Sequence, residues 1–139
     1  VTLGIRRGEL IALRWSDVDF TRGTIRVERT LTRDAEGEWM VGEVTKTDAS
    51  ARTIRLPDEC LAALKRHRVQ QNERRLAAGD AWEDSGAIFD RGLGDHWANG
   101  TELWRQFVAT LARLGLPRIR MHDMRHTAAT HMLRAGVPI

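Results

Sequence analysis

Three scarcities in the sequence limit what this protein can be. Its 139 residues include no tyrosine, a single cysteine (Cys60), and only two lysines, Lys46 and Lys65, among 22 basic residues. One cysteine excludes an internal disulfide bond, which is typical of proteins in the reducing cytoplasm. No apolar run approaches the length of a membrane span, and no signal peptide is visible. We therefore expect a cytoplasmic protein that does not cross a membrane.

The remaining composition is that of one folded domain. A chain of 139 residues, 42% of them hydrophobic, is large enough for a real core. The formal net charge of +3 is compatible with a nucleic-acid partner but does not require one. Because arginine is used almost wherever a positive charge is wanted, Lys46 in a predicted turn points to a site that needs a titratable ammonium group.

Hydrophobic periodicity predicts helices around a small antiparallel sheet. Alternation of apolar and polar residues predicts three short strands joined by tight turns, an antiparallel meander over residues 24–30, 39–44 and 52–56. Apolar residues at helical spacing predict four helices, over residues 5–15, 57–79, 102–114 and 121–133. Residues 80–96 are expected to form a loop with a short buried segment at 87–89. The predicted fold class is α+β, mainly helical with a three-stranded antiparallel sheet.

The helix that begins after Pro57 contains an almost wholly polar stretch from Lys65 to Arg75. Its arginines suit two interpretations. They would follow a phosphate backbone, or they would belong to a helix extension that meets only water, which is the more common explanation for such a stretch.

The helix predicted over residues 121–133 carries a pair of chemically informative residues. His122 and Arg125 are three positions apart and therefore project from one helix face, one turn apart. A guanidinium binds phosphate oxygens with a planar fork of donors, and an imidazole can transfer a proton near neutral pH. This pair suits an anionic, reacting group, whose other ligands must come from elsewhere in the chain.

Three motifs together resemble a known family. They are Gly4-Ile5-Arg6-Arg7-Gly8-Glu9-Leu10, then Lys46 between two hairpin strands, then His122-Asp123-Met124-Arg125. In this order and spacing they closely resemble the catalytic domain of tyrosine recombinases, the phage-integrase family. The segments Leu13-Arg14-Trp15-Ser16-Asp17-Val18-Asp19 and Gly115-Leu116-Pro117 fit as well. The resemblance spans nearly the whole chain and implies that family's catalytic-domain fold for residues 1–139.

The resemblance implies site-specific recombination of double-stranded DNA. A tyrosine attacks a phosphodiester to give a 3′-phosphotyrosyl link and a free 5′-hydroxyl, and a second strand reverses the step without metal or cofactor. By resemblance, Arg6 and Arg125 clamp the phosphate, and Lys46 is the acid for the 5′ oxygen. His122 assists proton transfer at the tyrosine, and Glu9 holds Arg6 in place. Family members also assemble as homo-oligomers on DNA.

The sequence departs from the family in one large respect. In the family, another His or Trp and the nucleophilic tyrosine follow the His-x-x-Arg helix, whereas this sequence stops at Ile139 and contains no tyrosine. The usual N-terminal DNA-binding domain is also missing. We therefore expect a fragment of an integrase catalytic domain, lacking its C-terminal end. It would keep most of the phosphate site, lack the nucleophile and be inactive alone.

A metal-dependent hydrolase is one alternative. His122-Asp123-x-x-His126 places two imidazoles four residues apart beside an acid, as in zinc proteases, and His131 or His96 would complete the ligand set. Arg125 on the same helix opposes this interpretation, because a cation beside both rings repels a divalent metal ion.

A non-catalytic DNA-binding module with the same fold is the second alternative. Such a module has no need of Lys46, His122 and both arginines together. The sequence that follows Ile139 would discriminate between this module and the recombinase, because a tyrosine a few turns further on supports the enzyme.

Overall fold

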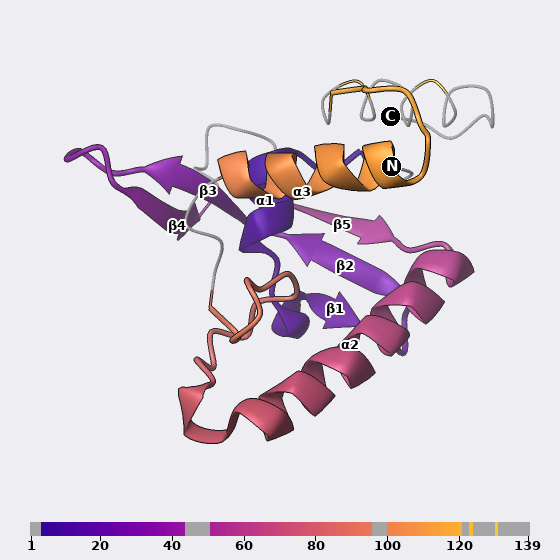
Figure 1. Cartoon of the computed structure of the whole chain (residues 1–139). Coiled ribbons are helices and arrows are strands. Elements are labelled where there is room, and N and C mark those ends of the chain that lie inside the picture. Colours follow the sequence, from indigo (N-terminus) through magenta and orange to yellow (C-terminus); the bar gives the residue numbers. More distant parts are fainter. Residues whose placement is uncertain (1–3, 44–50, 96–99, 121–122, 124–129, 131–139) are drawn as a thin grey trace.

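The structure, a computed structural model, describes residues 4–43, 51–95, 100–120, 123 and 130 (Figure 1). The five described strands follow one another between α1 and α2, an α+β arrangement as predicted. None of the described helices is long and apolar enough to cross a membrane. The elements are α1 (Arg7–Ala12), the 3₁₀ turn η1 (Trp15–Asp17), β1 (Val18–Asp19), β2 (Thr24–Val27), β3 (Arg29–Arg33), β4 (Trp39–Glu43), β5 (Arg52–Arg55), α2 (Asp58–Ala78), the 3₁₀ turn η2 (Gly79–Ala81) and α3 (Gly100–Arg113).

The strands form two antiparallel sheets, so the predicted single meander is wrong. The stretch predicted as one strand over residues 24–30 is divided at Glu28 into β2 and β3. β2 lies between β1 and β5 in a three-stranded sheet, with Ile25 opposite Ile54, whereas β3 pairs with β4 in a separate hairpin. In Figure 1 this hairpin extends away from the three-stranded sheet. Alternation of side chains shows which face of a strand is buried, but it does not identify the neighbouring strand.

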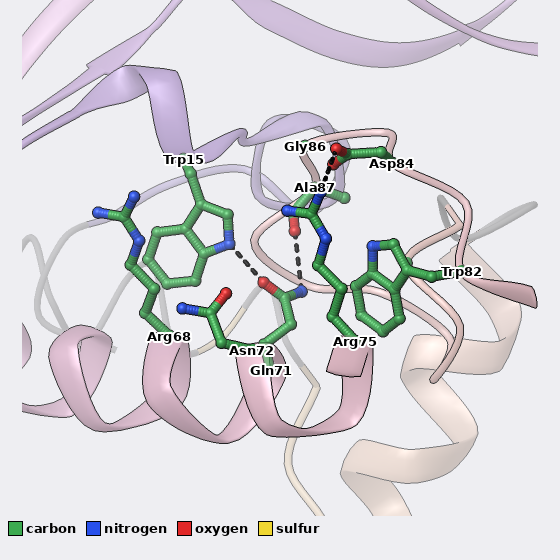
Figure 2. A pocket seen from close by; sticks show the side chains of 10 residues that line it. Trp15, Arg68, Gln71, Asn72, Arg75, Trp82, Asp84, Gly86 and Ala87 are labelled. Atoms are coloured by element: carbon green, nitrogen blue, oxygen red, sulfur yellow. Dashed lines mark hydrogen bonds and ion pairs between the residues drawn. The ribbon is translucent and has the colours of Figure 1, made fainter. Parts of the chain in front are cut away.

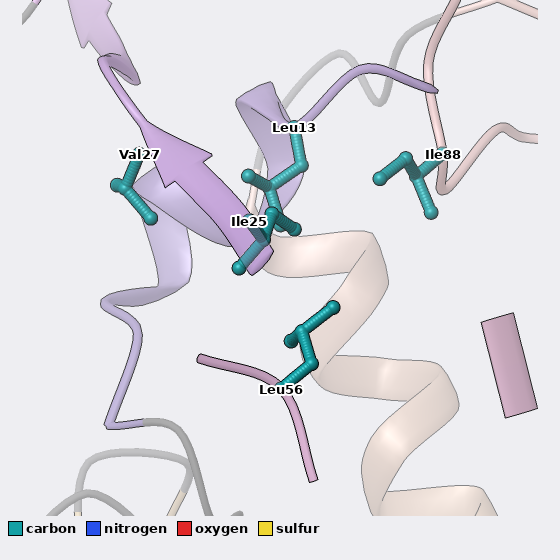
Figure 3. Packing of buried hydrophobic residues seen from close by; sticks show 5 residues of the cluster. All are labelled: Leu13, Ile25, Val27, Leu56 and Ile88. Carbon is teal, nitrogen blue, oxygen red and sulfur yellow. The ribbon is translucent and has the colours of Figure 1, made fainter. Parts of the chain in front are cut away.

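The core lies where the three-stranded sheet meets the segment after α1 and the loop after η2 (Figure 3). Ile25 and Val27 are buried on the same face of β2. Ile88 is fully buried, and its N–H donates to the carbonyl of Leu13 at 3.0 Å. The buried segment predicted at residues 87–89 is thereby confirmed for Ala87 and Ile88. Five side chains form the cluster: Leu13, Ile25, Val27, Leu56 and Ile88.

The first half of α2 covers this core. The helix starts directly after Pro57 and ends at Gly79, as predicted. Leu61 and Leu64, with Cys60, are partly buried and pack against the core cluster. Carboxylates in the first turn of the helix face its positive end, which stabilises the start of the helix.

One face of the polar second half of α2 contacts the loop after η2. The prediction of a solvated helix extension is therefore wrong for that face. Gln71 is only 4% exposed, and its amide donates to the carbonyl of Ala87 at 3.0 Å. Arg74 pairs with the buried carboxylate of Asp90 at 3.0 Å. The loop after η2 is therefore fastened to α2 by polar contacts, which hydrophobic periodicity does not detect.

Helix α3 lies beside α1 and ends as the sequence predicts (Figure 1). Leu111 is its buried apolar residue, at 7% exposure. Gly115 follows the helix with a φ of 65°, a backbone conformation that glycine adopts without strain. The N–H of Gly115 donates to the carbonyl of Ala112 at 3.1 Å, and that of Leu116 to the carbonyl of Leu111 at 2.9 Å. These two hydrogen bonds form a Schellman motif, which satisfies the last carbonyls of the helix.

Candidate active site

The first predicted site residue, Arg6, stands immediately before α1 and is held by Glu9. The backbone N–H of Arg6 donates to Glu9 Oε2 at 2.8 Å, and Arg6 Nη1 donates to Glu9 Oε1 at 3.3 Å. A carboxylate at the third position of a helix can fold back in this way, and the positive helix end favours it. The side chain of Glu9 is 2% exposed, whereas that of Arg6 is 56% exposed. A buried anion thus holds a guanidinium at the surface.

A second guanidinium, that of Arg52, reaches the same carboxylate from β5. Arg52 Nη1 donates to Glu9 Oε1 at 3.0 Å, and Arg52 Nη2 donates to Glu9 Oε2 at 2.8 Å. Sequence reasoning missed this residue, although a signal exists. In the alternating strand β5, Arg52 shares the half-buried face with Ile54, while Thr53 is exposed. A charge on the inward face of a strand requires a partner of opposite sign.

The two arginines keep the Glu9 carboxylate charged although it is buried. Burial alone would raise the pKa of the Glu9 carboxyl, but the hydrogen bonds of Arg52, the backbone N–H of Arg6 and the positive charges of both arginines together lower it below its ordinary value. The hydrogen bond to Glu9 raises the pKa of Arg52. Glu9 is therefore ionised at neutral pH, and the cluster of two arginines and one carboxylate carries a net charge of +1.

The glycine of the first motif explains how α1 reaches this position. A Cβ atom on Gly8 would lie 2.7 Å from Thr30 Oγ1 and 3.1 Å from the carbonyl oxygen of Leu31. Only glycine allows α1 to approach β3 this closely. The motif thus combines a packing residue, Gly8, with the pair Arg6 and Glu9 on either side of it.

Three predicted site residues, Lys46, His122 and Arg125, lie outside the described residues, so their convergence with Arg6 stays a prediction. Of the helix predicted over residues 121–133, the structure describes Asp123 and Thr130. The candidate metal ligands also lie outside the described part: His96, His122, His126 and His131. Within the described residues there is no group of three or more potential metal ligands.

A small pocket of about 190 Å³ lies elsewhere, between α2 and the loop after η2 (Figure 2). The indoles of Trp15 and Trp82 lie on either side of Gln71, which accepts a hydrogen bond from Trp15 Nε1. Arg75 on its rim pairs with Asp84 at 2.9 Å. Because Gln71 and Arg75 already bond within the protein, we interpret this pocket as the seam between α2 and the loop. The candidate active site remains at Arg6.

Comparison with known proteins agrees with the motif around Arg6. The sequence profile of the phage integrase family matches residues 1–139. The chain belongs to the phage integrase family. A tyrosine recombinase XerC-like protein of Caldanaerobacter subterraneus is 33% identical, over 98% of this chain and 37% of that protein. An integrase of Streptomyces ambofaciens is 30% identical, over 98% of this chain and 36% of that protein. The chain thus spans little more than a third of these relatives.

Solved structures show the same fold. The crystal structure of XerA recombinase matches with a TM-score of 0.69 and 24% identity, over 99% of this chain and 42% of that chain. The Tn1549 transposon integrase, in complex with transposon right end DNA, matches with a TM-score of 0.73 and 22% identity, over 99% and 44% of the two chains. The predicted family and fold class are therefore confirmed, and the metal-hydrolase alternative gains no support.

Proposed function

We propose that residues 1–139 form part of the catalytic domain of a tyrosine-type site-specific DNA recombinase, in which Arg6 binds the phosphate that is cleaved. Membership of the phage integrase family supports the reaction class. The observation that carries the assignment of the site is the buried carboxylate of Glu9, which holds the half-exposed guanidinium of Arg6 at 3.3 Å.

The chemistry of phosphodiester cleavage explains this arrangement. Negative charge grows on the non-bridging oxygens in the transition state, and a guanidinium fixed in advance stabilises it without rearranging. In this proposal Arg125 is the second phosphate ligand, Lys46 protonates the leaving 5′ oxygen, and His122 assists proton transfer at the nucleophile. No metal ion or cofactor takes part.

The nucleophile is a tyrosine that these 139 residues do not contain. Serine and threonine hydroxyls do not replace it, because an unactivated hydroxyl is a poor nucleophile. We infer that the parent protein supplies the tyrosine from sequence outside this chain.

The proposed partner is double-stranded DNA in the cytoplasm, bound by a homo-oligomer of the full protein. The Tn1549 transposon integrase, which shares the fold, is described in complex with DNA. For this chain alone we expect weak binding with little sequence preference and strong salt dependence, because arginine–phosphate contacts release counterions.

Titration of a labelled duplex at several salt concentrations tests the phosphate site. Arg6→Ala is expected to reduce the slope of log affinity against log salt by about 1, the value for one lost phosphate contact. Arg22→Ala is a matched control, because Arg22 pairs with Asp19 at the same three-residue spacing and its side chain is 83% exposed. Affinity that is independent of salt, or equal slopes for the two variants, would contradict the proposed phosphate site.

A nicked suicide substrate tests the reaction itself. The 139-residue chain is expected to give no covalent protein–DNA adduct, whichever metal is supplied. A version extended past Ile139 to include a tyrosine should give one, and Arg125→Ala should abolish it. An adduct from the shorter chain would refute the assigned nucleophile. A tyrosine-containing extension that binds DNA without forming an adduct would favour the non-catalytic module.

A further inference from the structure

We propose that Arg52 is a positioning residue of this phosphate site, which acts on Arg6 through Glu9. The inference rests on the proposed function. Arg52 is 43 positions from Glu9 in the sequence and comes from a different element, β5. It belongs to none of the three motifs that identified the site.

The contacts of the Glu9 carboxylate show which residue orients it. Each oxygen accepts one hydrogen bond from Arg52, at 3.0 and 2.8 Å, so the guanidinium and carboxylate planes are joined by a fork. The guanidinium of Arg6 makes a longer contact, 3.3 Å, to one oxygen. The backbone N–H of Arg6 also donates to Oε2, at 2.8 Å. A two-pronged pair between two side chains fixes their orientation as well as their distance. Arg52 and the Arg6 backbone therefore orient the carboxylate together, and the carboxylate in turn orients the Arg6 guanidinium.

The order of exposure supports this division between the two arginines. The side chain of Arg52 is 30% exposed, and that of Arg6 is 56% exposed, with the carboxylate at 2% between them. The more buried Arg52 directs its fork at Glu9, and the more exposed Arg6 is the arginine that a phosphate would contact.

The charge balance gives a second reason for the more buried arginine. A pair of Arg6 and Glu9 alone would be neutral, so the residue that holds Arg6 would also cancel its attraction for phosphate. Arg52 restores a net charge of +1 to the cluster. A lysine would restore the charge but could not bind both oxygens in a fork. Arg52→Lys thus separates positioning from charge.

A double-mutant cycle on DNA binding by the 139-residue chain tests the inference. Arg6→Ala, Arg52→Met and the double variant are titrated with a labelled duplex at one salt concentration, at a temperature where circular dichroism shows each to be folded. Each single change is expected to weaken binding about three- to tenfold, the range for a partly exposed charged contact. In the Arg6→Ala background Arg52 still contributes its charge but has no guanidinium to position, so the loss of affinity in the double variant should be smaller than the product of the two single losses.

Arg55→Met is the matched control. Arg55 lies on the same strand and is exposed on the opposite face. Any loss of DNA affinity caused by Arg55→Met should multiply with the loss caused by Arg6→Ala, because the two residues act independently. Arg52→Lys provides the second measurement, and it carries the test if Arg52→Met does not fold. We expect Arg52→Lys to weaken DNA binding, though less than Arg52→Met does. Its loss of affinity should not multiply with the loss caused by Arg6→Ala.

The outcomes separate this inference from the proposed function. If Arg6→Ala does not weaken DNA binding, the proposed phosphate site and the positioning role of Arg52 are both wrong. If Arg6→Ala weakens binding but losses from Arg52→Met or Arg52→Lys multiply with it, the positioning role is overturned while the phosphate site stands. Wild-type affinity in both Arg52 variants would overturn the positioning role in the same way.

Discussion

Replacing Glu9 by glutamine should destabilise the folded protein far more than a carboxylate-to-amide change usually does. Glu9 is 1% exposed and accepts hydrogen bonds from Arg52, from the Arg6 side chain and from the Arg6 backbone. Glutamine has nearly the same shape, so the change removes the charge and one acceptor without opening a cavity. Its NH₂ group would face guanidinium donors that it cannot satisfy.

The magnitude follows from the partners that are left behind. Breaking a buried ion pair by neutralising one member costs about 3–5 kcal/mol, because the other charge stays without compensation. Both arginines here are partly exposed, at 56% and 30%, so water solvates them in part and the expected loss is smaller. We expect about 2–3 kcal/mol of unfolding free energy, which lowers Tm by roughly 5–10 °C in a domain of this size.

Urea unfolding monitored by circular dichroism at pH 7 measures this difference. The control is Asp84→Asn, because the Asp84–Arg75 pair has side chains 62% and 53% exposed and should contribute less than about 1 kcal/mol. A loss below about 1 kcal/mol for Glu9→Gln, equal to the control, would refute the argument that the buried carboxylate is held by its two arginines.

The stability difference between wild type and Glu9→Gln should also depend on pH. The pKa of Glu9 in the folded protein is lowered from its ordinary value of 4.5, against the effect of burial, mainly by the hydrogen bond of Arg52. A lowered folded-state pKa contributes stability that is present above pH 4.5 and is lost as the pH falls through the folded-state value. The difference between wild type and Glu9→Gln should therefore be constant near neutrality and shrink below pH 4.5. A difference that grows on acidification would contradict this linkage.

Three further substitutions test the packing that supports the site, each by urea unfolding. Gly8→Ala should destabilise by about 1–3 kcal/mol, because its Cβ would lie 3.1 Å from a backbone oxygen of β3. Ile88→Ala should cost about 2–5 kcal/mol, because Ile88 is fully buried. Gln71→Leu should cost about 1–3 kcal/mol, since Trp15 Nε1 loses its acceptor. Wild-type stability in any of them would contradict the corresponding contact.

Local features of the fold could be predicted from the sequence because they depend on neighbouring residues. The start of α2 after Pro57, its end at Gly79 and the end of α3 at Gly115 each follow from backbone preferences over one turn. The contact between Arg6 and Glu9 belongs to the same class, since three positions make one helical turn. The polar loop contacts of Gln71 could not be predicted, because hydrogen-bond partners distant in sequence leave no periodic signal.

By itself, the sequence determined the family, the α+β class, the ends of α2 and α3, and the pair Arg6 and Glu9, whereas the first helix, predicted over residues 5–15, is limited to Arg7–Ala12. Only the tertiary structure decided that β5 pairs with β2 rather than with β4, and that Arg52 thereby meets Glu9. The physical reason is the range of the interactions. A turn, a helix end or an i,i+3 contact is set by a few adjacent dihedral angles, whereas strand partners and buried ion pairs depend on how distant segments pack around one core.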